Sequence, residues 1–170
     1  MNKRCAMWQL LTPVLIAGVL CTILPVRAAT LTVKGSVTQP PCVINGGSAI
    51  LVNFGDDIMT TRIDGKAYNK RSLNYTVKCE GDMTGASALQ IMIKGTAASF
   101  GSGLLKTDKT GLGVQFLASG TNLALNTGGA DFDYLTGQPP VIEAVLARDA
   151  SVVLTGGQFT ATATMYVNYQ

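Results

Sequence analysis

The sequence predicts an all-β domain built as an antiparallel sandwich. From residue 29 onwards apolar residues alternate with polar ones, as expected for strands that bury one face. No window of ten or more residues repeats its apolar positions every three or four residues, which argues against helices. Turn-forming residues separate the alternating runs. Several short strands joined by such turns are typical of a β-sandwich.

The alternating runs give the expected strands in order. They lie at 30–38, 50–54, 73–79, 89–93, 114–116, 141–147, 151–154 and 159–169. The last run is the most regular, and one of its faces is formed by Phe159, Ala161, Ala163, Met165, Val167 and Tyr169. Turns between the runs are expected at Asn45-Gly-Gly, Asp64-Gly, Glu80-Gly-Asp, Gly137-Gln-Pro-Pro and Gly156-Gly157.

The first 28 residues are typical of a cleaved export signal. Lys3 and Arg4 precede an apolar run over 10–24, and small residues lead to a cleavage site after Ala28. A membrane anchor is the alternative, but the run is short for a spanning helix and a β-like segment comes after it. We therefore expect an exported mature chain of 142 residues, 29–170.

Charge and composition argue against several classes of function. The chain has 13 basic and 10 acidic residues; Lys3, Arg4 and Arg27 belong to the signal, so 10 of each sign remain. A neutral chain without a basic stripe is a poor candidate for binding nucleic acid. The sequence has no His, which removes the commonest general base and a leading metal ligand. We expect no catalysis, cofactor, metal or small-molecule substrate.

The close carboxylate and aromatic pairs are explained more simply as structure than as sites. Asp56-Asp57 and the pair Asp131 and Asp133 sit beside turn signals, where Asp accepts hydrogen bonds from nearby backbone, and a calcium site would need more oxygen ligands. Phe132 and Tyr134 are interpreted as core residues rather than as a surface patch.

Cleavage of the signal leaves two cysteines, because Cys5 and Cys21 depart with it. In an oxidising compartment Cys42 and Cys79 are most simply one disulfide, with free thiols or a shared metal as the alternatives. By closing a loop in the unfolded chain, such a bond stabilises the folded state by about 4 kcal/mol in the chain-entropy treatment.

The two ends of the mature chain present complementary problems. The strand 159–169 runs to the last residue, so no later segment is expected to pair beside it. The segment 30–38 is strand-like, but Pro40-Pro41 detaches it from the next strand of the chain. Either this segment completes another molecule by β-strand addition, or it pairs within its own chain as an ordinary first strand. The pattern alone favours neither arrangement.

These features together resemble pilin subunits of the chaperone–usher pathway of Gram-negative bacteria. A short extension with alternating apolar residues and an internal glycine (30–38) precedes Cys42 in Pro-Pro-Cys-Val-Ile-Asn-Gly-Gly, and a later cysteine stands in Tyr-Thr-Val-Lys-Cys79. Gly157 is the fourteenth residue from the end, and Tyr169 is penultimate. The resemblance spans nearly all of 29–170, with tip or adaptor subunits of P and type 1 pili as the nearest kind.

The resemblance implies an incomplete immunoglobulin-like sandwich that lacks its last strand and is completed in trans by a donor strand. The implied domains are the signal 1–28, the donor extension 29–40 and the pilin domain 41–170. Leu31, Val33, Gly35 and Val37 would be the donor side. Acceptor groove and chaperone-binding strand would comprise Gly157, Phe159, Ala161, Ala163, Met165, Val167, Tyr169 and the carboxylate of Gln170.

The resemblance also implies the partners and the location. A periplasmic chaperone would lend a strand to the groove, and the neighbouring subunit's extension would displace it at the outer-membrane usher. The product would be a cell-surface fimbrium used in cell adhesion. The alternative function is a self-contained secreted β-sandwich that binds a ligand or inhibits an enzyme, and it predicts that 30–38 pair within their own chain.

Overall fold

The computed structural model describes residues 29–170, so the predicted export signal, with Cys5 and Cys21, lies outside the described residues. Residues 37–170 form one compact unit, and residues 29–36 fall in a separate one. Within the described part of the chain, no helix is both long and apolar enough to cross a membrane.

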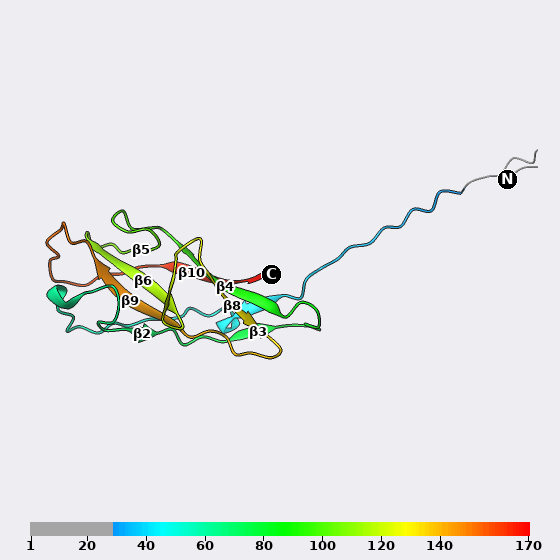
Figure 1. Cartoon of the computed structure of the whole chain (residues 1–170), viewed down its shortest axis with the longest axis horizontal. Helices are drawn as coiled ribbons and strands as arrows, with labels where there is room; N and C mark the ends of the chain where they lie inside the picture. The colour runs from blue at the N-terminus through cyan, green and yellow to red at the C-terminus, as the bar shows by residue number, and fades with distance from the viewer. Residues whose placement is uncertain (1–28) are drawn as a thin grey trace, which may run out of the picture. The chain divides into compact units, whose positions relative to one another are not determined.

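Ten strands and two short 3-10 turns make up the compact unit (Figure 1). In order they are β1 (Cys42–Ile44), η1 (Asn45–Gly47), η2 (Thr60–Arg62), β2 (Arg71–Ser72), β3 (Val77–Cys79), β4 (Ala88–Gly95), β5 (Leu105–Lys106), β6 (Leu112–Ala118), β7 (Thr121–Leu123), β8 (Gly129–Asp133), β9 (Ile142–Arg148) and β10 (Ala163–Tyr169).

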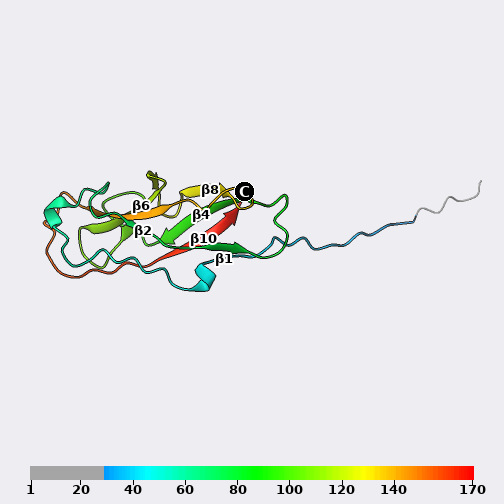
Figure 2. The same ribbon diagram turned by 90° about the horizontal axis from the view of Figure 1, so that it is seen from below.

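The strands form two main antiparallel sheets and a small third one (Figure 2). One sheet has the order β10-β4-β8. The other has the order β2-β9-β6-β5, with β7 paired to β6. β1 pairs with β3 as a separate two-stranded sheet. The predicted all-β antiparallel architecture is therefore confirmed.

The core lies between the two main sheets and results from the alternation in the sequence. On β4, Leu89, Ile91 and Ile93 are at most 2% exposed, whereas their neighbours in sequence are more exposed. β6 and β9 are buried along almost their whole length, as expected for strands at the centre of a covered sheet. Burying each of these aliphatic side chains contributes about 1.5–3 kcal/mol.

Several expected strands are absent as paired strands. Residues 29–41, 48–54, 151–154 and 157–162 belong to no strand. A turn at Ala150 and Ser151, in which Ser151 N–H donates to the Asp149 carboxylate (2.9 Å), takes the place of the start of the run 151–154. In 50–54 the alternation persists nevertheless, because Phe54 is buried while Leu51 is 92% exposed. These residues have the pattern of a strand without a neighbour to pair with.

The run 73–79 was also predicted too simply. Only its last part is a paired strand: β3, in which Cys79 pairs with Cys42 on β1. The strand just before the run, β2, pairs with β9 in a different sheet. The chain crosses from one sheet to the other between them, so residues 73–76 have no ladder. The short strands β5, β7 and β8 were not predicted, because none shows a long alternation in the sequence.

Candidate functional site: a groove along the open edge of β10

A groove of about 880 Å³ runs along the edge of β10 that does not face β4. We call it the edge groove. One wall is formed by 159–167 and the other by β1 and 47–52. Its floor consists of residues from both main sheets, namely Ile93, Leu105, Val114, Phe116 and Ala144. All five belong to the main core, so the edge groove opens directly onto the hydrophobic core.

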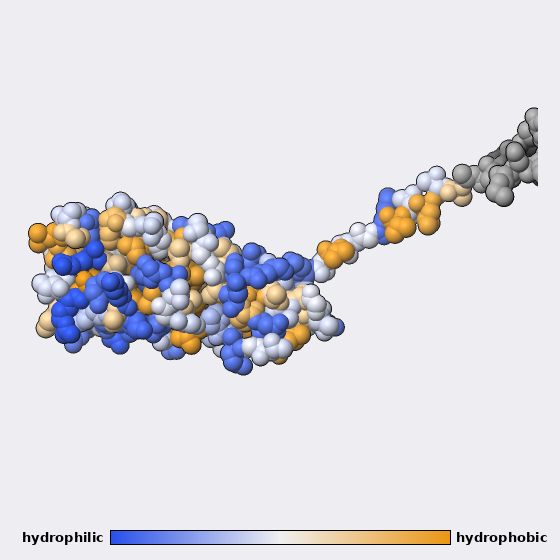
Figure 3. All heavy atoms as spheres, in the orientation of Figure 1, coloured by the Kyte–Doolittle hydropathy of each residue, from blue (hydrophilic) through white to orange (hydrophobic). Residues whose placement is uncertain are grey.

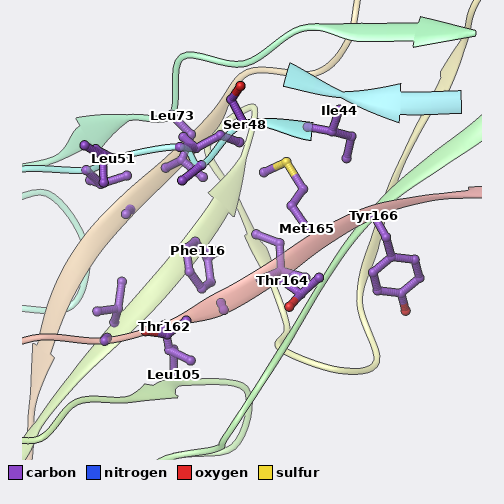
Figure 4. Close-up of a pocket in the computed structure, with 18 of the residues that line it drawn as sticks. Ile44, Ser48, Leu51, Leu73, Leu105, Phe116, Thr162, Thr164, Met165 and Tyr166 are labelled. Carbon is purple, nitrogen blue, oxygen red and sulfur yellow. The ribbon is translucent and has the colours of Figure 1, made fainter. Parts of the chain in front are cut away.

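The walls face the groove mainly with apolar side chains. Figure 4 shows Met165 projecting from β10 on the side of Ile44, while the ring of Tyr166 points to the other side of the β10 ribbon. Phe116 lies on β6 at the floor. Ile50 and Val52 on the opposite wall are only half-buried. Large apolar side chains left in contact with water in one continuous hollow are typical of a binding surface.

The backbone along this edge has free hydrogen-bonding groups. In an antiparallel strand, successive residues direct their N–H and C=O groups to opposite edges. Gln170 N–H donates to Ala88 C=O at the start of β4 (3.1 Å), and the register runs without a break to Ala163 opposite Gly95. Even-numbered residues of β10 are therefore directed to β4. Odd-numbered ones, such as Met165 and Val167, are directed to the open edge, where no described strand pairs with them.

The two walls meet at one end of the groove. The rings of Phe54 and Phe159 lie 6.0 Å apart between centroids, tilted by 48°. Phe54 C=O accepts hydrogen bonds from Asn69 Nδ2 (2.8 Å) and Arg71 Nη2 (3.0 Å), which fix its wall to the body of the domain. Past the aromatic pair a second hollow of about 630 Å³ continues, lined among others by Gly157.

At the opposite end, the predicted disulfide is confirmed. Cys42 and Cys79 are bonded and stand opposite each other in the β1–β3 ladder. Tyr169 packs beside them: its hydroxyl donates to Pro40 C=O and lies 3.1 Å from Cys42 Sγ. Tyr169 therefore fastens the end of β10 to the point where the N-terminal segment leaves the domain, and it lies outside the edge groove.

The remaining C-terminal residues named from the sequence occupy different places. Phe159, Ala161, Ala163, Met165 and Val167 all line the edge groove, as do the residues between them. Of the residues in this wall, only Phe159, Ala163, Met165 and Val167 also pack against the main core. Gly157 adopts φ +117° and lies in the second hollow. Gln170 is exposed, and its Nε2 donates to the Asp131 carboxylate (2.6 Å).

The N-terminal segment carries the predicted donor residues in an exposed and unpaired form. Leu31, Val33 and Val37 are 87%, 82% and 99% exposed, and a Cβ built on Gly35 would meet nothing within 4 Å. Figure 3 shows hydrophobic and hydrophilic side chains alternating at the surface of this segment. The apolar side chains of this segment therefore form a face that no other residue of the segment covers.

Asp133 and the two predicted core aromatics lie as expected. Asp133 accepts from the N–H groups of Leu135 and Thr136 (2.9 Å each), and a hydrogen bond from Ser87 is the main reason that its pKa is lowered. Tyr134 and Phe132 pack on the disulfide cluster, with Tyr134 Oη accepting from Cys79 N–H (3.2 Å). Asp131 does not lie beside a turn as predicted: it stands in the middle of β8, whereas Asp133 is the last residue of that strand, and it accepts from the side chains of Gln90 and Gln170.

Half of the site was not predicted from the sequence. The wall 159–167 was identified, but the wall 47–52 and the floor were not, although the alternation of Ile50, Val52 and Phe54 was a signal for an extended wall. Nothing local in the sequence indicates that residues from β5, β6 and β9 meet under these walls.

Comparisons with known proteins agree with this architecture. The family model for fimbrial proteins matches residues 31–170. Among curated proteins, the fimbrial-like protein YfcQ of Escherichia coli K12 is 32% identical over 146 residues, covering 82% of this chain and 86% of that protein. The minor fimbrial protein PrsF of Escherichia coli is 27% identical, covering the same shares.

Solved pilus subunits share the fold. The P pilus rod subunit PapA matches with a TM-score of 0.58 at 21% identity, covering 76% of this chain and 99% of PapA. The P pilus adaptor subunit PapF matches with a TM-score of 0.54 at 25% identity, covering 79% of this chain and all of PapF. The chain therefore belongs to the fimbrial protein family: it is a pilin of the chaperone–usher kind with an incomplete immunoglobulin-like β-sandwich.

Proposed function

We propose that this protein is a structural subunit of an adhesive surface fimbria and polymerises by donor-strand exchange. The extension of one subunit, with Leu31, Val33, Gly35 and Val37 facing inward, fills the edge groove of its neighbour. The observation that supports this most is the edge groove itself, an apolar channel that reaches the core beside a strand edge with free backbone groups.

The energetics favour an inserted strand over any small ligand. An extended segment supplies hydrogen bonds to the odd-numbered residues of β10 and places every second side chain in the groove. Burial of three aliphatic side chains is worth roughly 5–9 kcal/mol before the cost of ordering the segment. Gly35 suits a point where the floor leaves no space for a Cβ.

The proposed route to the surface involves two further partners. During passage through the periplasm, a chaperone occupies the edge groove with a strand of its own, which keeps the apolar residues from aggregating. The C-terminal carboxylate of Gln170, which is exposed, meets basic residues of that chaperone. At the outer-membrane usher, the extension of the incoming subunit displaces the chaperone strand. The role is structural and not enzymatic.

Within the fibre we propose a minor tip or adaptor position. The similarity to PrsF, which is named a minor fimbrial protein, and to the adaptor PapF supports this assignment.

Two arginine substitutions test the donor role. Gly35→Arg places a large side chain where the proposed donor faces the groove, whereas Ser36→Arg places the same side chain on the outward face. Both positions are exposed in the free segment, so neither change should disturb the fold. We expect Gly35→Arg to retain capture by the chaperone but to lose incorporation into fibres, and Ser36→Arg to retain both.

The readout is the amount of subunit in the periplasm and in isolated fibres, each measured by immunoblot. Normal incorporation of the Gly35→Arg chain would contradict the donor assignment. Equal loss in both variants would show that an added arginine anywhere in the extension blocks assembly, and would remove the argument for an inward face at Gly35.

A further inference from the structure

The acceptor wall continues past the end of its own sheet, and something other than β4 must hold it there. β4 ends at Gly95, opposite Ala163, yet the edge groove is lined as far back as Phe159. After Gly95 the chain turns away from the wall. Thr96 C=O accepts from Lys106 N–H of β5 (2.8 Å), so this carbonyl is bonded to β5 and not to the wall. Residues 157–162 therefore have no ladder to keep them extended.

Beyond the end of β4, Asp108 supplies the hydrogen bonds that hold the wall. Its carboxylate accepts from Thr160 N–H (2.7 Å) and from the Thr160 hydroxyl (2.9 Å), and its own N–H donates to Thr160 C=O (3.0 Å). Asp108 thus engages every polar group of Thr160. The hydrogen bond from Thr160 N–H is also the largest cause of the lowered pKa of Asp108.

The loop that carries Asp108 is itself fixed. Thr107 is 3% exposed, and its hydroxyl donates to Leu112 C=O (2.8 Å) and accepts from Lys109 N–H (3.1 Å). Lys109 Nζ donates to Gly156 C=O (2.9 Å), so this loop holds the wall at a second point. Hydrogen bonds to the loop between β5 and β6, two strands of the other main sheet, therefore hold the wall in place beyond the end of β4.

The side on which the backbone of Thr160 is hydrogen-bonded determines the direction of its neighbours' backbone groups, because successive residues of an extended chain point them to opposite edges. Thr160 is even-numbered, like the β10 residues directed to β4, so Asp108 continues the same side of the ladder. Its neighbours Phe159 and Ala161 then direct their N–H and C=O groups to the open edge. We propose that Asp108 is a positioning residue that extends the acceptor edge of the groove from β10 to Phe159, so that the incoming strand pairs with Phe159 and Ala161 as well as with β10.

This inference rests on the proposed strand addition and is tested on a self-complemented chain, in which 29–38 is repeated after Gln170 through a flexible linker. The measurement is hydrogen exchange at single amides. With Asp108 intact, we expect protection at Phe159 and Ala161 as well as at Met165 and Val167. Asp108→Ala should reduce protection at Phe159 and Ala161 by about tenfold or more, the effect of losing one to two hydrogen bonds, and leave the other two unchanged.

Matched variants separate positioning from general destabilisation. Asp131→Ala removes another exposed carboxylate that accepts two hydrogen bonds, including one from Gln170, and should leave Phe159 and Ala161 protected. Asp108→Asn keeps an oxygen for Thr160 N–H and should restore most of the protection. If Asp108→Ala does not fold, Thr160→Val removes the hydroxyl contact alone and should shift the same two amides by less.

The outcomes are distinct. Unchanged protection at Phe159 and Ala161 in Asp108→Ala, or an equal loss at all four amides, would overturn the positioning role while leaving strand addition standing. Absence of protection at Met165 and Val167 in the unsubstituted self-complemented chain would overturn strand addition by this extension and, with it, this inference.

Discussion

Removal of the disulfide is the perturbation whose effect can be worked out most fully. Cys42 and Cys79 are 37 residues apart in sequence and form the first pair of the β1–β3 ladder. β1 has only three residues, and all three line the edge groove. The bond therefore restrains the unfolded chain and also holds one wall of the groove to the domain.

The expected magnitude comes from the loop that the bond closes. For a separation of 37 residues the chain-entropy treatment gives about 4 kcal/mol. Cys42→Ala combined with Cys79→Ala also removes the contact between Cys42 Sγ and Tyr169 Oη (3.1 Å), but Tyr169 keeps its hydrogen bond to Pro40. We therefore expect the free energy of unfolding to fall by about 4 kcal/mol.

The assay is guanidinium unfolding of the self-complemented chain, followed by circular dichroism. The double variant should have a lower midpoint, and the unsubstituted chain in reductant should behave like the variant. Because the reduced unfolded chain exposes more surface, a modest rise in the m-value is also expected. A decrease of less than about 1 kcal/mol would refute the view that the bond is a main restraint on the domain.

Three further predictions concern the C-terminal strand, the core and the response to alkali. Tyr169→Ser should weaken chaperone capture and lower the periplasmic level of the subunit, whereas Tyr169→Phe, which keeps the ring, should do so less; unchanged pull-down yields for Tyr169→Ser would contradict this. Phe116→Ala at the groove floor should lower the free energy of unfolding of the self-complemented chain by about 3–5 kcal/mol in guanidinium titrations, and a loss below about 1 kcal/mol would show that the floor is not packed. Burial raises the pKa of Tyr75 to about 12, and its hydroxyl donates to Pro140 C=O (2.5 Å). Since the folded state favours the neutral phenol, its contribution to stability is complete below pH of about 10 and is lost as the pH rises towards 12. Thermal melts between pH 8 and 12 should show this decline, and Tyr75→Phe should make it shallower; identical slopes would contradict it.

Much of the fold was predictable because it depends on local patterns. The period of two along 159–169 predicted the C-terminal strand that forms part of one groove wall, and the two cysteines outside the predicted export signal predicted the disulfide. Both inferences need only residue type and spacing.

The features that could not be predicted depend on contacts between distant segments. A strand exists only where a neighbour pairs with it, so 50–54 and 157–162 have strand-like sequences without strands. The crossing between sheets at 73–76 likewise leaves the first part of a continuous alternation without a strand. Asp108 shows the limit most clearly: it stands in an ordinary turn sequence, and only the fold brings it to Thr160.

The central claim is that the sandwich lacks a strand, which a neighbour supplies. The most direct test compares thermal unfolding of the chain 29–170 with and without a donor strand fused after Gln170. The strand should be taken from 29–38 and from the extensions of candidate neighbouring subunits. We predict a large rise in the midpoint and suppression of aggregation with a cognate strand. A stable monomer whose midpoint is indifferent to every added strand would contradict the account.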